Sequence, residues 1–132
     1  MKIAKMLILA MVLAVGLGCG YSKKATTPPS PGTKPTITQL NPASATSGGA
    51  AFTLEVDGTS FASGATVSFA GVTYTPDAST KSATKLEAAI PAAAIMNSGT
   101  VSVTVTNPGT SGGIYGGGTL PETSTPMNFT VN

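Results

Sequence analysis

Apolar and polar residues alternate with a period of two in five separate segments after residue 36. Successive side chains of a β-strand point to opposite faces, so each segment predicts a strand with one buried and one solvated side. Such strands are typical of antiparallel sheets with one face on a core. The five segments are residues 52–57, 66–69, 85–90, 101–106 and 127–132.

Short clusters of Gly, Pro, Asn, Asp and Ser separate these segments and predict turns. The clusters lie at residues 47–49, 57–58, 62–64, 75–77, 97–99 and 107–109. Residues 91–96 predict one helical turn between two strands. Residues 36–132 therefore predict an all-β domain, a single immunoglobulin-like antiparallel β-sandwich. We expect Phe52, Phe69, Phe129 and the Val, Ile and Leu residues of these strands to form its core.

The first 18 residues have the pattern of a cleaved signal peptide. Lys2 and Lys5 form a basic start, and the apolar stretch 6–17 is shorter than the ~20 residues that a spanning helix needs. The sequence Gly16-Leu17-Gly18-Cys19 then resembles a bacterial lipobox. The resemblance implies cleavage before Cys19 and acylation of Cys19 with chains such as palmitate. The lipobox usually has Leu three places before the Cys, whereas Gly16 and Leu17 are in the reverse order. An ordinary signal peptide with an incidental Cys is the alternative.

Residues 19–35 would then be the lipidated Cys and a Pro-rich tether. The segment 20–35 contains four prolines and almost no apolar side chains, which predicts disorder or polyproline II. The expected location is the cell envelope, with the membrane bound through the lipid on Cys19. Because Gly20, and not Asp, follows the Cys, the lipoprotein sorting rule favours the outer membrane in a host with two membranes.

Charge excludes one class of partner. Five lysines and five acidic residues follow Cys19, so this part carries no net charge, and the chain has no Arg. Nucleic-acid binding depends on clustered positive charge, so we expect no nucleic-acid partner.

The order of motifs resembles the IPT/TIG family of immunoglobulin-like domains. The motifs are Ile37-Thr38-Gln39-Leu40-Asn41-Pro42, Ser47-Gly48-Gly49, Phe52 to Phe61, Val67 to Val72 and Val101 to Asn107. The resemblance implies a spacer or interaction module and no shared catalytic residues. The loop 107–126 is longer and richer in Gly than the family pattern.

That loop is the main candidate contact site. Loops beyond ~12–15 residues without secondary structure are usually functional or disordered. Ile114 and Tyr115, flanked by glycines, are the candidate contact residues. The alternative is a flexible Gly-rich insertion or a short hairpin extension.

Other candidate sites have less support. Tyr74 and Tyr115 are the aromatic candidates for sugar binding, and we expect Tyr74 to pack at a strand edge instead. Glu55 and Asp57 share one strand face without a second acidic cluster, so we expect no metal site. The chain has no His, and Ser68 or Ser102 beside Lys81 or Lys85 lacks a catalytic motif. We expect no enzyme activity and no cofactor.

The sequence therefore predicts a lipid-anchored envelope protein. Its immunoglobulin-like domain would act as a binding or scaffolding module for another protein or an envelope polymer such as a polysaccharide. The alternatives are a structural spacer without a specific ligand and a carbohydrate-binding module.

Overall fold

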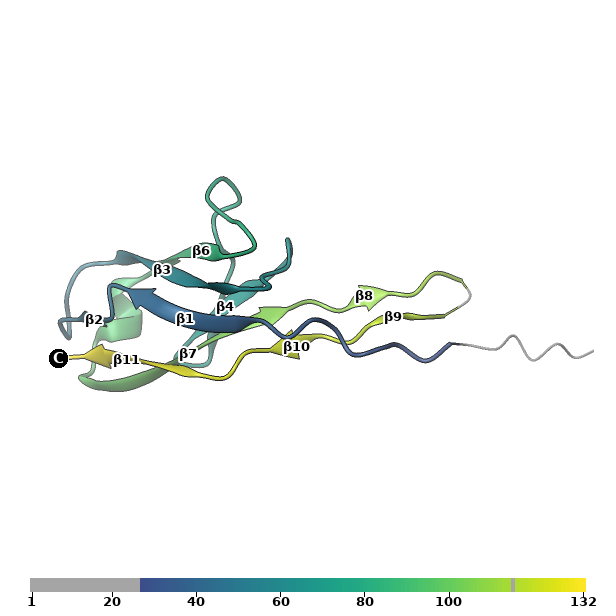
Figure 1. Cartoon of the computed structure of the whole chain (residues 1–132). Helices are drawn as coiled ribbons and strands as arrows, with labels where there is room; N and C mark the ends of the chain where they lie inside the picture. Colours follow the sequence, from purple (N-terminus) through teal and green to yellow (C-terminus); the bar gives the residue numbers. More distant parts are fainter. Residues whose placement is uncertain (1–26, 115) are drawn as a thin grey trace, which may run out of the picture.

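The computed structural model describes residues 27–114 and 116–132, and nearly all of its regular structure is strand (Figure 1). One 3₁₀ turn, η1, covers Ala92–Ile95 and confirms the predicted helical turn. The strands are β1 (Thr36–Asn41), β2 (Ser44–Ala45), β3 (Phe52–Thr59), β4 (Thr66–Phe69), β5 (Val72–Tyr74), β6 (Lys85–Ile90), β7 (Gly99–Asn107), β8 (Thr110–Ser111), β9 (Gly118–Thr119), β10 (Glu122–Thr123) and β11 (Met127–Val131).

Two sheets form the predicted β-sandwich. One has the order β1-β3-β6, and the other has the order β2-β11-β7-β4-β5 with β10 also paired to β7. β1 and β2 follow each other in the chain but belong to different sheets, and the Asn41–Pro42 peptide between them is cis. Among the named strands, β2 and β11 pair in parallel and the other pairs are antiparallel. The immunoglobulin-like fold class is confirmed.

The core lies between the sheets and confirms the period-two pattern. In β3, Leu54 and Val56 are fully buried, while the alternate residues are at least partly exposed. Phe69 and Phe129 are fully buried with their rings edge to face, 5.1 Å between centroids. Phe52 stacks on Phe129 at 5.6 Å but is only half-buried, so it borders the core and is not inside it.

Gly58 corrects one predicted turn. β3 continues through Asp57 and Gly58 to Thr59, and Gly58 pairs with Ile37 of β1. A β-carbon on Gly58 would overlap the Thr36 carbonyl oxygen and the Phe61 ring. Glycine is therefore needed here for the close approach of β1 and Phe61, and not for chain reversal.

A second correction concerns residues 107–109. β7 ends at Asn107, but the chain does not reverse there: it continues into β8, which pairs with β9. β10 then pairs with the end of β7, so β8, β9 and β10 form a hairpin that projects from the sandwich (Figure 1). We call residues 108–121 the arm. Gly116, Gly117 and Gly118 have φ of 81°, 86° and 95°, which explains a run of glycines near its tip.

The described part of the predicted tether, residues 27–35, lies along the arm (Figure 1). The backbone N–H of Ser30 donates to the Gly118 carbonyl at 3.0 Å, and that of Leu120 donates to the Ser30 carbonyl at 2.9 Å. The Gly117 N–H donates to the Thr27 carbonyl at 2.7 Å. Of the two predicted alternatives, disorder and polyproline II, these hydrogen bonds rule out disorder for residues 27–35. Prolines keep the segment extended. The N–H and carbonyl groups of Ser30, between two prolines, serve as hydrogen-bond partners for the open edge of β9.

Candidate functional site

The sandwich has two different ends. The arm leaves one end, and the described chain begins at Thr27 beside the arm's tip (Figure 1). η1 and the C-terminus lie at the other end. The strand register agrees, since Thr36 at the arm end pairs with Thr59, whereas Phe52 and Ile90 pair at the far end of β3 and β6.

Asn107 joins three segments at the base of the arm. Its side chain is 4% exposed, and its Oδ1 accepts a hydrogen bond from the Ala62 N–H at 2.9 Å. Its Nδ2 donates to the Thr33 carbonyl at 2.8 Å and to the Ser60 carbonyl at 2.7 Å. The residue therefore links β7, the β3–β4 loop and residues 27–35. The sequence places Asn107 at the end of a strand motif and the start of a turn and loop, but predicts no buried role for it, because nothing local distinguishes a buried Asn from an exposed one.

The tip of the arm carries Ile114, one of the two predicted contact residues. Its side chain is 77% exposed, the highest value among the exposed large apolar residues of the described chain. Tyr115, the other predicted contact residue, lies outside the described residues, as does Cys19. The hairpin extension, which the sequence left open, is the observed form of the loop.

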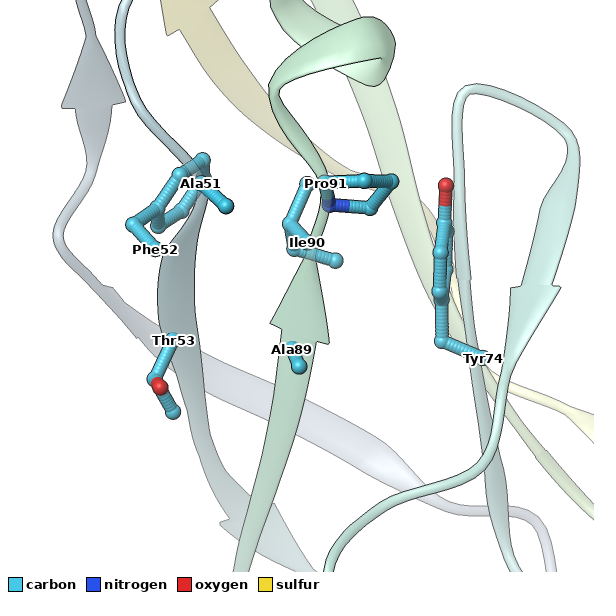
Figure 2. Close-up of a pocket in the computed structure, with 7 residues that line it drawn as sticks. All are labelled: Ala51, Phe52, Thr53, Tyr74, Ala89, Ile90 and Pro91. Carbon is cyan, nitrogen blue, oxygen red and sulfur yellow. The ribbon is translucent and has the colours of Figure 1, made fainter.

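An apolar concavity of about 710 Å³ lies at the opposite end, over the end of β6 and between the start of β3 and the edge strand β5 (Figure 2). Phe52 and Tyr74 flank Ile90 and Pro91 in it. Its remaining lining residues are Ala51, Thr53 and Ala89. Tyr74 is half-buried at the edge of its sheet, as predicted. The concavity offers apolar contact area with the hydroxyls of Thr53 and Tyr74 as polar side-chain groups, which suits an apolar or amphipathic partner group.

This concavity was missed by the sequence analysis. Phe52 was assigned to the core because its place in the alternation of β3 is that of a buried residue. The alternation does not show that β3 begins and β6 ends at this point, so that the Phe52 ring packs on Phe69 and Phe129 of the second sheet and is still partly exposed to solvent.

The polar face of β3 and β6 carries the predicted acidic pair. The Lys85 Nζ lies 2.9 Å from Glu55 Oε1, and this hydrogen bond raises the pKa of Lys85, partly opposed by desolvation. In the β5–β6 loop, hydrogen bonds from the Ser79 hydroxyl and backbone N–H hold the pKa of Asp77 below its usual value. The charge of Glu55 is thus balanced by Lys85, an arrangement that is typical of a solvated strand face.

The candidate Ser and Lys pairs are divided between elements. Ser68 and Ser102 lie on β4 and β7 of one sheet, whereas Lys85 lies on β6 of the other and Lys81 lies in the β5–β6 loop. Within residues 27–114 and 116–132, no three His, Cys, Asp or Glu side chains are placed to hold a metal ion together. The same described ranges contain no helix with the length and apolar character needed to cross a membrane.

Comparison with known families gives one match. The family model described as IPT/TIG domain matches residues 35–122, which include strands β1 to β7 of the sandwich, the arm and the start of β10. No curated protein sequence matches the chain significantly.

Proposed function

Because the chain belongs to the IPT/TIG domain family, we propose that it is a non-enzymatic binding or scaffolding module, anchored in a bacterial cell envelope by lipid on Cys19. The outer membrane is the proposed location in a host with two membranes. The partner is another envelope component, either a protein or a polysaccharide.

The opposite placement of the arm and the concavity is the observation that carries this proposal. The chain runs toward Cys19 from Thr27, at the tip of the arm, while the concavity lies at the far end of β3 and β6. Residues 27–33 and the arm would therefore act as a stalk. An anchor on Cys19 would leave the concavity facing away from the membrane, where a partner has access to it.

The anchor is tested by the intact mass and the membrane fractionation of the full chain, alongside the Cys19→Ser variant. We expect a mature N-terminus at Cys19 with added acyl mass and residence in the membrane fraction. The Cys19→Ser variant should lose the added acyl mass and the residence in the membrane fraction, because stable anchoring needs two or more acyl chains. A soluble product without acyl mass, cleaved elsewhere, would contradict the anchor.

The binding surface is tested by placing a photo-crosslinking residue at Tyr74, with Thr73 as the matched control. Both positions lie on β5, but Tyr74 borders the concavity while Thr73 is exposed and pairs with Ser68. We expect a discrete crosslinked product in intact cells from position 74 and none from position 73. The absence of a product at both positions would favour the spacer function over binding.

A further inference from the structure

We propose that the tip of the arm rests on the bilayer that holds the Cys19 lipid, and that Ile114 forms a second contact with that bilayer. The inference builds on the proposed lipidation of Cys19. It assigns the predicted contact loop to a lipid surface and leaves the concavity for the partner.

The length of chain between the anchor and the tip carries the argument. Thr27 forms a β-bridge with Gly116, next to the tip, and only the seven residues 20–26 separate Thr27 from Cys19. The eight Cα–Cα steps from Cys19 to Thr27 span at most about 29 Å when the chain is fully extended, and less in any other conformation. The tip is therefore held within that distance of the lipid, while η1 and the C-terminus lie at the opposite end of the molecule (Figure 1).

The arm cannot easily turn away from this position, because residues 27–33 are bonded to it along its length. Ser30 pairs with Gly118 and Leu120 through backbone hydrogen bonds, and its hydroxyl also donates to the Gly118 carbonyl at 3.2 Å. At the base, Asn107 bonds the Thr33 carbonyl. The chain that leads to the lipid and the hairpin thus approach the membrane as one unit.

The chemistry of the tip suits a lipid surface. Residues 25–33 and 108–121 contain no charged residue, so contact with the headgroup region would desolvate no charge. Ile114 is flanked by Gly113 on its N-terminal side and is 77% exposed. Moving this side chain out of water is favourable, and the small neighbouring residue does not obstruct its approach to the membrane.

The test uses the full chain, acylated in a bacterial host and reconstituted in vesicles of neutral phosphatidylcholine. A polarity-sensitive dye is attached to the new thiol of Gly113→Cys, where a side chain meets open space. Acylated Cys19 has no free thiol and takes no dye. The matched control is Met96→Cys, which replaces a 68% exposed apolar residue just after η1, at the opposite end. A third protein combines Gly113→Cys with Ile114→Asn.

We expect the dye at position 113 to show a blue shift and quenching by brominated lipid, and the dye at position 96 to show neither. The Ile114→Asn change should remove most of the shift and the quenching. Equal, water-like spectra at positions 113 and 96 on an acylated protein would overturn the inference and leave the proposed function standing. A full signal that survives Ile114→Asn would overturn the role of Ile114.

Two further outcomes separate the alternatives. A blue shift at position 113 that occurs in native membranes but not in lipid vesicles would mean that the tip contacts a protein, and would overturn the lipid contact. Intact mass without acyl chains on Cys19 would overturn both the inference and the proposed anchor.

Discussion

Replacing Asn107 by Ala is expected to lower the free energy of unfolding by about 2–4 kcal/mol, measured by chemical denaturation. The change removes three hydrogen bonds and leaves the Ala62 N–H and the carbonyls of Thr33 and Ser60 without their partner. These bonds are only part-buried, so water can partly replace Asn107, but the loss of three bonds together costs more than the mean value of one hydrogen bond. The matched control is Asn128→Ala, on the exposed face of β11, which should change stability by less than about 0.5 kcal/mol.

A second substitution separates the donors of Asn107 from its acceptor. Asn107→Asp keeps an oxygen for the Ala62 N–H but turns a carboxylate oxygen toward two carbonyl oxygens. Burial and these carbonyls would raise the pKa of the introduced carboxyl in the folded state. The loss of stability should therefore be largest at neutral pH, and should shrink as pH falls below the raised pKa and the group becomes a donor. Equal stability of Asn107→Ala and wild type would show that the contacts at the base of the arm contribute nothing.

Replacing Phe129 by Ala is expected to lower the free energy of unfolding by about 3–5 kcal/mol. The ring is fully buried between the sheets, stacks on Phe52 and meets Phe69 edge to face. Its removal leaves a cavity at the centre of a domain whose total stability is on the order of 5–15 kcal/mol. Chemical denaturation of the variant and of wild type measures the loss.

Phe52→Ala is the control for this prediction. It removes the same ring from the same cluster, but at a half-buried position beside the concavity. We expect it to cost clearly less than Phe129→Ala, because less area returns to water and the site opens to solvent without leaving an enclosed cavity. A cost equal to or greater than that of Phe129→Ala would contradict the placement of the core between the two sheets.

The sequence predicted the long strands β3, β4, β6, β7 and β11 and most of the core from local information, but not the short strands of the arm. In β3, β6 and β7 the alternation of apolar and polar residues is sufficient, because a strand places successive side chains on opposite faces regardless of its neighbours. The predicted anchor at Cys19 also comes from a local pattern and stays a prediction. The long Gly-rich loop predicts Ile114 and Tyr115 as contact residues, and the structure places Ile114 at an exposed tip.

Other features depend on segments far apart in the sequence. Gly58 looks like a turn residue until Thr36 and Phe61 pack against it. Residues 27–35 look like a disordered or polyproline II tether until the open edge of β9 provides hydrogen-bond partners. Asn107 gains its role from Thr33, which is 74 residues away.

The sequence by itself thus determined the fold class, the strand faces and the charge-free character of the arm. Tertiary structure alone decided that the arm and residues 27–35 form one unit, and that a concavity forms where Phe52, Ile90 and Tyr74 come together. The physical reason is the distance along the chain over which each feature is determined. Strand periodicity follows from backbone geometry within a few residues, whereas register, edge pairing and cavity shape depend on which distant segments the closed core brings together.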